Sequence, residues 1–181
     1  MSKIVVFTKE GFEDRTAEFN NDVHNLEEKG FSNIISSLKV IGAPWVAYYG
    51  KNFSGKQRVF EEGAYATLED KEKFCSLKII TDDLDNPEFQ LFEHINYKGR
   101  TMTLHQETNL LEIAFSDIAS YHKVKGGVWV LYEHINHKGA QLVAFSGEQV
   151  PSYLPLSFND VASHVRSLLP KPLTASYAFF S

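Results

Sequence analysis

The chain has 181 residues, of which 43% are hydrophobic and 23% charged, as in an ordinary globular protein of one large or two small domains. It carries 18 Lys and Arg against 23 Asp and Glu, a net charge of −5, which argues against a general binder of nucleic acid. The single cysteine, Cys75, excludes an internal disulfide and favours a reducing compartment. The apolar run at residues 4–7 is too short for a signal peptide or a membrane span, so we expect a cytoplasmic protein.

Taken in chain order, the predicted elements are short strands. Residues 20–29 are expected to form a helical turn at most, because no segment shows a long stripe of apolar residues at helical spacing. Residues 45–48 and 128–132 are aromatic and β-branched, as strands prefer, and residues 89–92 and 101–104 alternate between apolar and polar. Asn- and Gly-containing turns follow several of these strands, so the sequence predicts an all-β fold.

A repeated motif organises the chain. Residues 92–99 and 132–139 are identical at six of eight positions. Diverged copies begin at Phe7 and Tyr48, and in the first copy Asp14 stands where the others have glycine. The first and third motifs are 85 residues apart and the second and fourth are 84 apart, which indicates two domains with two motifs each.

A second signal follows each motif at a matching distance. It is a phenylalanine, then small polar or acidic residues, then one or two serines, and it occurs at residues 31–37, 115–120 and 158–163. The second repeat keeps only part of it, at residues 74–76. The acidic stretch between the second and third repeats, which contains a proline, is typical of a linker.

This pattern resembles the Greek-key motif of the βγ-crystallin family, in which an aromatic residue, four residues, a second aromatic, one residue and a glycine follow one another. The resemblance covers roughly residues 3–170 and includes some likeness to the epidermis differentiation-specific proteins of amphibian skin. It implies an all-β protein of two βγ-crystallin domains, each a β-sandwich of two Greek-key motifs. We expect domain 1 at residues 1–82, a linker at 83–88, domain 2 at 89–170 and a C-terminal tail at 171–181.

The residue types of the motif follow from the backbone geometry and packing of the folded hairpin. The glycine permits the positive φ that is needed where the hairpin folds down, so Gly99 and Gly139 should adopt it. The first aromatic packs on the folded hairpin. Asp14 replaces a glycine and His137 replaces the second aromatic, so those two hairpins are expected to be less regular.

The resemblance also implies calcium binding, because many non-lens members bind Ca²⁺ through two Asn or Asp residues, two variable residues, Ser or Thr, and Ser. Each domain would have two sites, and each site would combine a carbonyl from one loop, a hydroxyl from the partner loop and the carbonyl after the first hairpin aromatic. Calcium prefers such hard oxygen ligands. The candidate metal ligands are Asn33, Ser36, Glu93, Asp117, Ser120, Glu133, Asn159, Asp160 and Ser163, with Glu93 and Glu133 acting through their carbonyls.

Domain 2 is the better candidate for calcium. The second loop of domain 1 has Lys71, Glu72 and Cys75 where the motif has oxygen ligands, and a thiol is too soft for this ion. Ser, Asn and Asp in such loops also cap turns, so a purely structural role for the loops is the alternative.

Other chemistries find less support. His94, His134 and His137 are more simply explained as polar hairpin positions shared by duplication than as a zinc site, which needs converging ligands. Neither a nucleophile elbow nor a Gly-rich phosphate loop is present. We therefore expect a monomeric, non-enzymatic, calcium-binding protein with a structural or stress-protective role, without nucleic-acid partners. The alternative is a carbohydrate-, membrane- or protein-interaction module without calcium dependence.

Overall fold

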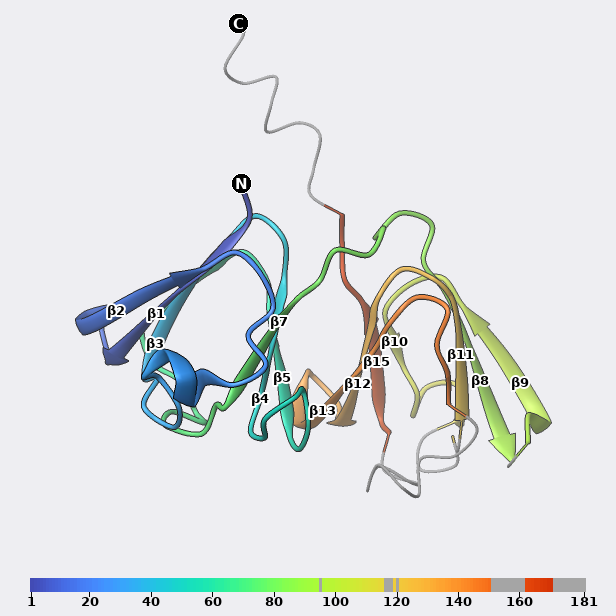
Figure 1. The fold of residues 1–181 in the computed structure, drawn as a ribbon. Coiled ribbons are helices and arrows are strands. Elements are labelled where there is room, and N and C mark those ends of the chain that lie inside the picture. Colours follow the sequence, from blue (N-terminus) through green and yellow to red (C-terminus); the bar gives the residue numbers. More distant parts are fainter. Residues whose placement is uncertain (95, 116–118, 120, 151–161, 171–181) are drawn as a thin grey trace, which may run out of the picture. The chain divides into compact units, whose positions relative to one another are not determined.

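The computed structural model describes residues 1–94, 96–115, 119, 121–150 and 162–170 (Figure 1). The chain divides into two compact units: unit 1 is Met1–Thr81 with Lys138–Val143, and unit 2 is Asp82–His137 with the chain from Ala144 onward. The domain boundaries and linker drawn from the repeats stay a prediction, and the predicted tail lies outside the described residues.

The first sheet of unit 1 combines strands from both of its motifs. The first motif supplies the hairpin β1 (Lys3–Lys9) and β2 (Glu13–Phe19) and the later strand β3 (Ser37–Ile41). The fourth strand, β6 (Gly63–Tyr65), comes from the second motif and pairs with β3, which gives the order β2-β1-β3-β6. The two Greek keys of unit 1 are therefore intercalated, as the resemblance implies.

The other strands of unit 1 belong to the second motif. β4 (Trp45–Tyr48) lies between β5 (Gln57–Phe60) and β7 (Ser76–Ile79), and all pairings are antiparallel. The first motif contributes only a bridge from Val23 to β7 at this place, followed by the short 3₁₀ helix η1 (Leu26–Lys29). This helix is the predicted helical turn.

Unit 2 repeats the exchange of strands. In the third motif, β8 (Glu88–His94) pairs with β9 (Lys98–Leu104) and with β11 (Tyr121–Gly126). β14 (Gln149–Val150), from the fourth motif, pairs with β11 and completes the order β14-β11-β8-β9. The exchange is thus present in both units.

The fourth motif forms the remaining strands. β12 (Trp129–His134) precedes the last hairpin and β13 (Lys138–Ala144) follows it. β15 (His164–Ser167) pairs with β12 on one side and with β10 (Thr108–Asn109), from the third motif, on the other. With these strands the all-β prediction is confirmed.

Each unit has its own apolar core with one tryptophan. Trp45 is fully buried in unit 1 together with Phe74, and Trp129 is fully buried in unit 2 together with Phe89. The rings of Phe89 and Trp129 are 5.2 Å apart. Burial of such large aromatic side chains is a major source of stability for units of this size.

The hairpin turns have the left-handed backbone that the motif requires. Gly55, Gly99 and Gly139 have φ of 78°, 77° and 79°, which confirms the prediction for the last two. Asp14 has φ of 70° and His137 has φ of 61°, close to the 60° of Tyr97 at the position of His137 in the third motif. The expectation of less regular hairpins at Asp14 and His137 is therefore wrong for the backbone.

Side-chain contacts explain why these substitutions are tolerated. The Thr8 hydroxyl donates a hydrogen bond to the Asp14 carboxylate at 2.6 Å, which supports the left-handed turn. The His137 ring packs on Tyr132 with centroids 5.0 Å apart, as the Tyr97 ring packs on Phe92 at 5.2 Å. An imidazole therefore fills the place of the second aromatic.

Candidate functional site

The two loops of unit 1 that carry predicted calcium ligands face each other. We call residues 32–37 the first loop and residues 71–76 the second loop. The N–H of Asn33 donates to the carbonyl of Phe74 at 2.9 Å, and the N–H of Glu72 donates to the carbonyl of Ile35 at 2.8 Å. Asn33 and Glu72 are both the second residue of their loop, and both have positive φ. Each site in unit 1 would therefore draw on both loops, as the resemblance implies.

The fifth residue of each described loop is fixed against a hairpin. The N–H groups of Ser36 and Cys75 donate to the carbonyls of Phe7 and Tyr48 at 2.9 and 2.8 Å. These carbonyls belong to the first aromatic of each motif. The fifth residue therefore lies where the resemblance expects the hydroxyl ligand, next to the start of the folded hairpin.

One of the two places in unit 1 holds a thiol. The Cys75 thiol donates to the side-chain oxygen of Asn33 at 3.2 Å and accepts a hydrogen bond from the Ser32 hydroxyl at 3.4 Å. The Asn33 side chain is thus paired with a thiol, a soft group that cannot replace the hydroxyl ligand. This place fits calcium poorly.

The other place in unit 1 combines Ser36 with the second loop. Ser36 is buried, and the facing loop supplies Lys71 and Glu72 instead of Asn or Asp. The Lys71 ammonium is 3.0 Å from the Glu10 carboxylate, so an ion pair accompanies this loop. This place lacks the Asn or Asp that the motif requires.

The sixth residue of each loop in unit 1 has a structural role. The Ser37 hydroxyl donates to the carbonyl of Lys9 at 2.6 Å and accepts from the N–H of Phe12 at 3.0 Å. The Ser76 hydroxyl makes the same two bonds, to Gly50 at 2.6 Å and from Phe53 at 3.0 Å. These serines tie the folded hairpin to the sheet.

Unit 2 contains the remaining candidates, and only some of them are described. Asp117, Ser120, Asn159 and Asp160 lie outside the described residues. Ser163 is half-buried, and its N–H donates to the carbonyl of Tyr132 at 2.9 Å, in the same way as the fifth residues of unit 1. Unit 2 therefore places a hydroxyl-bearing residue where unit 1 has Cys75.

The two glutamates predicted to act through their carbonyls use their side chains elsewhere. The Glu93 carboxylate accepts hydrogen bonds from the backbone N–H and the Nε of Arg100, at 3.1 and 3.2 Å. The backbone bond from Arg100 is the main reason why the pKa of Glu93 lies below its usual value. Glu133 Oε1 lies 3.8 Å from Nε2 of the exposed His134.

The structure also assembles a cluster that sequence reasoning missed, formed by Glu107, His137 and His164. The Nε2 atoms of both histidines contact Glu107 Oε1, and the distance to His164 is 2.7 Å. Burial alone raises the pKa of Glu107, but the hydrogen bonds from His164 and His137 outweigh it and hold this pKa below the usual value. A usable signal was present: His137 replaces an aromatic and His164 replaces a serine in the same repeat.

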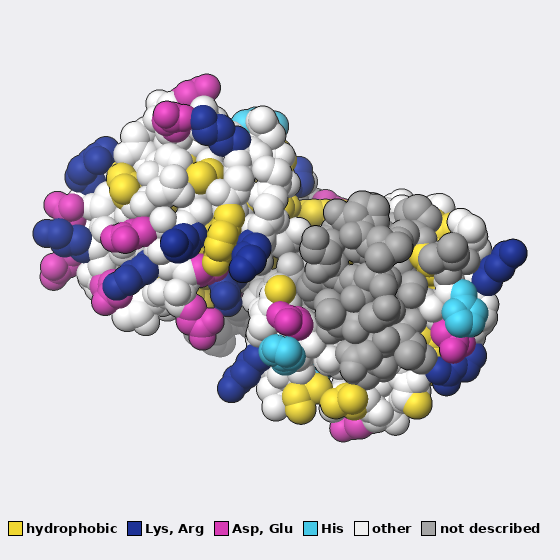
Figure 2. Space-filling model, turned by 90° about the horizontal axis from the view of Figure 1, so that it is seen from below, with side chains coloured by type: hydrophobic (Ala, Val, Ile, Leu, Met, Phe, Trp, Pro, Cys, Tyr) yellow, Lys and Arg dark blue, Asp and Glu magenta, His cyan; other side chains and the backbone are white. Residues whose placement is uncertain are grey.

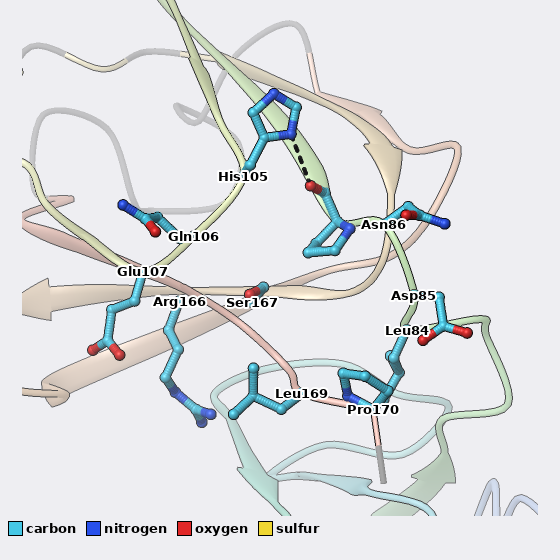
Figure 3. Close-up of a pocket in the computed structure, with 11 residues that line it drawn as sticks. Leu84, Asp85, Asn86, His105, Gln106, Glu107, Arg166, Ser167, Leu169 and Pro170 are labelled. Atoms are coloured by element: carbon cyan, nitrogen blue, oxygen red, sulfur yellow. Dashed lines mark hydrogen bonds between the residues drawn. The ribbon is translucent and has the colours of Figure 1, made fainter. Parts of the chain in front are cut away.

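A hollow of about 370 Å³ lies in unit 2 beside this cluster (Figure 3). Glu107 and Arg166 stand at one end, and Asp85 and Asn86 stand at the other. His105 Nδ1 is 3.2 Å from the carbonyl of Pro87 within the lining. None of the predicted calcium ligands that the structure describes lines the hollow.

One face of the described surface carries charges of both signs. On the face drawn in Figure 2, Lys and Arg side chains stand among Asp and Glu side chains and do not form a separate basic patch in the coloured part. Within the described ranges, none of the helical segments has the length and apolar character needed to cross a membrane.

Comparison with known proteins agrees with this architecture. The Beta/Gamma crystallin family model matches residues 3–80 and 88–167. The epidermal differentiation-specific protein of Cynops pyrrhogaster is 40% identical over 168 residues, which are 93% of this chain and 50% of that protein. Human beta-crystallin B1 is 31% identical over 154 residues, 81% of this chain and 61% of that protein. The chain thus spans between half and two thirds of the length of these relatives.

A solved structure of the same family was also matched. The beta gamma crystallin from Ciona intestinalis has a TM-score of 0.42 and 26% identity, and the match covers 43% of this chain and 99% of that one. The family model accounts for both pairs of repeats, and the intercalated Greek keys of both units have the topology that the family motif implies. This chain belongs to the beta/gamma-crystallin family.

Proposed function

We propose that this chain is a calcium-binding, non-enzymatic member of the family with a structural or stress-protective role, and that unit 2 is its calcium-binding part. The hydrogen bond from the N–H of Ser163 to the carbonyl of Tyr132 carries the proposal. It repeats the contact made by Cys75 in unit 1, with a hydroxyl in place of the thiol. A hydroxyl suits calcium and a thiol does not.

The equivalence of the repeats allows the loop contacts of unit 1 to be transferred to unit 2, which gives two proposed ligand sets. In unit 1, the fifth residue of one loop contacts the second residue of the other, as Cys75 contacts Asn33. The same register in unit 2 would combine Ser163 with Asp117 and the Glu133 carbonyl. Its counterpart would combine Ser120 with Asn159, Asp160 and the Glu93 carbonyl.

The charge of these sets also supports calcium. Each predicted set in unit 2 uses carbonyl and hydroxyl oxygens, and the side chain of Asp117 or Asp160 adds a negative charge to the loop that holds it. The loops of unit 1 instead contain Lys71 and Cys75. Hard, negatively charged oxygen ligands are what Ca²⁺ selects, so the two units should differ in affinity.

The test follows each unit by its own tryptophan. With Trp45→Phe, Trp129 reports the unfolding of unit 2; with Trp129→Phe, Trp45 reports unit 1. Calcium at a hundredfold excess over Kd should stabilise unit 2 by about 2.7 kcal/mol against a chelator reference, and unit 1 by less. Urea unfolding measures both.

Two serine variants make the test specific. Ser163→Ala should reduce the calcium-dependent shift of unit 2, because it removes a hard oxygen but little apolar packing. Ser36→Ala is the matched control at the same loop position in unit 1 and should leave the unit 2 shift unchanged. Equal shifts in both units would refute the asymmetry. An absence of any shift would refute calcium binding and favour the interaction-module alternative, which a glycan array can then examine.

A further inference from the structure

The cluster of Glu107, His137 and His164 is built by strand pairing. His164 begins β15, where it pairs with Asn109 of β10 on one side and with Tyr132 of β12 on the other. Glu107 immediately precedes β10, and His137 lies in the turn that follows β12. The sheet therefore fixes His164 between two segments, one of which carries an acid and the other a second imidazole.

The ligand atoms of the cluster lie at distances that suit a shared cation. One ring nitrogen of His137, one of His164 and one Glu107 oxygen all lie within 4.8 Å of one another. Four-coordinate zinc, with ligands at about 2.0–2.1 Å, needs ligand atoms about 3.3 Å apart. The Glu107 oxygen now lies 2.7 Å from His164 Nε2 and also contacts His137 Nε2, so the carboxylate would withdraw from both rings to admit the ion.

The exposure of the three side chains shows which of them can move to admit the ion. The side chain of Glu107 is 46% exposed and can move toward solvent. His164 is only 8% exposed and is fixed by its strand, and its ring stands at 80° to that of His137 with centroids 4.9 Å apart. A rigid buried ligand and an adjustable carboxylate can therefore close on an ion without movement of the sheet.

The protons of the cluster can also be placed. As hydrogen-bond donors to Glu107, both histidines carry a proton on Nε2. To bind a metal, each would use the Nε2 lone pair and carry its ring proton on Nδ1. His164 Nδ1 is buried and makes no hydrogen bond within the described part of the chain, so no observed bond opposes this change of tautomer.

The second motif shows which residues stand at the positions of His137 and His164 where no cluster is formed. Phe53 stands at the position of His137 and Ser76 at the position of His164, and Ser76 ties the hairpin through the N–H of Phe53. In the fourth motif both positions are histidine, and the serine bonds to the hairpin are given up. Two imidazoles that meet an acid from a neighbouring strand suit a metal better than they suit a core.

We propose that Glu107, His137 and His164 bind a divalent transition-metal ion with the preferences of Zn²⁺, and that water takes the fourth position. Two imidazoles and a carboxylate are a common ligand set for zinc and a poor one for calcium, which prefers oxygen. None of the three belongs to the predicted calcium ligands, so this site is separate from the proposed function.

The test is isothermal titration of the metal-stripped full chain with ZnCl₂ in the presence of excess CaCl₂. We expect one saturable Zn²⁺ site per chain. His137→Phe and His164→Ser restore the residue types that the first and second repeats hold at these positions, so both variants should fold, and each should weaken Zn²⁺ binding at least tenfold. Glu107→Gln keeps the size of the side chain, removes the charge and should also weaken binding.

His134→Gln is the matched control, because His134 is an exposed histidine in the same hairpin and outside the cluster. Its Zn²⁺ affinity should equal that of the wild type. Titration with Co²⁺ gives a second measurement, since the absorption of four-coordinate Co²⁺ should appear in the wild type and disappear in His164→Ser. The proposal is overturned if the wild type binds no Zn²⁺, if the cluster variants bind it within tenfold of the wild type, or if His134→Gln weakens binding as they do.

Discussion

Gly99 lies in the folded hairpin of the third motif, where alanine should be tolerated badly for two separate reasons. An alanine is strained at a φ of 77°, which should lower the free energy of unfolding by about 1 kcal/mol. The added Cβ would also lie 2.6 Å from the His94 ring and 3.1 Å from the Cβ of Glu93. The exposed His94 ring can turn away, but Glu93 is held by Arg100, so crowding should add about 1 kcal/mol. Gly99→Ala should therefore destabilise unit 2 by about 2 kcal/mol.

Gly147 provides the matched control for the backbone contribution. It has φ of 79°, but a Cβ built there meets no atom within 4 Å. Gly147→Ala should therefore lower the free energy of unfolding only through strain in the left-handed backbone, by about 1 kcal/mol. The difference between the two variants isolates the crowding at the hairpin.

Urea unfolding followed by the fluorescence of Trp129 measures both variants in a Trp45→Phe background. This background is suitable because the indole nitrogen of Trp45 is buried without a hydrogen-bond partner in the described structure. With an m-value of about 1 kcal/mol/M, the midpoints should fall by about 2 M for Gly99→Ala and about 1 M for Gly147→Ala. Equal midpoints for the two variants would refute the crowding argument, and wild-type midpoints for both would refute the left-handed assignment.

Three further substitutions test other contacts. Cys75→Ser places a hydroxyl beside Asn33 and should increase the calcium-dependent rise of the unit 1 midpoint; an unchanged rise would show that the thiol is not what disfavours calcium. His122 is buried, and desolvation lowers its pKa to about 3, so the unfolded chain binds the proton first and stability falls as the pH drops below about 6.5. His122→Phe should remove about 1.6 kcal/mol of this loss between pH 6.5 and 5, measured from urea midpoints at both pH values, and an unchanged pH dependence would contradict the assignment. The hydrogen bond from Thr8 lowers the pKa of Asp14 in the folded chain. The ionised Asp14 therefore stabilises the fold above pH 3.8, its unfolded pKa, and this stabilisation is lost as the pH falls through the folded pKa. Asp14→Gly should keep the neutral-pH melting temperature or raise it and should flatten the acid loss; a lower melting temperature at pH 7 would show that the side-chain contact outweighs the strain of the turn.

The sequence predicted the hairpins well because their physics is local. An aromatic, a second aromatic and a glycine at fixed spacing form the folded turn by themselves, and the φ of Gly99 and Gly139 follows from it. The error at Asp14 was also local, since a neighbouring threonine supports the strained turn. That threonine lies six residues earlier in the chain, at one of the positions that the motif leaves variable.

The histidine cluster escaped prediction because it depends on which strands pair. Sequence reasoning weighed His134 with His137, which are three residues apart, but the structure directs His137 to Glu107, thirty residues earlier in the chain. Only the exchange of β10 into the neighbouring motif brings Glu107 beside β15. Such a contact cannot be read from spacing within one repeat.

The strand exchange has a consequence for how such a unit could arise. A single motif leaves one strand, such as β6 or β14, without the sheet to which it belongs, and leaves its own sheet one strand short. A lone motif would therefore be completed by a second copy of itself, each chain lending its strand to the other. Duplication within one gene turns that pair of chains into one chain and removes the dependence of folding on concentration. By the same reasoning, a chain cut between the two motifs of a unit should still reassemble from its fragments, because the borrowed strand holds them together.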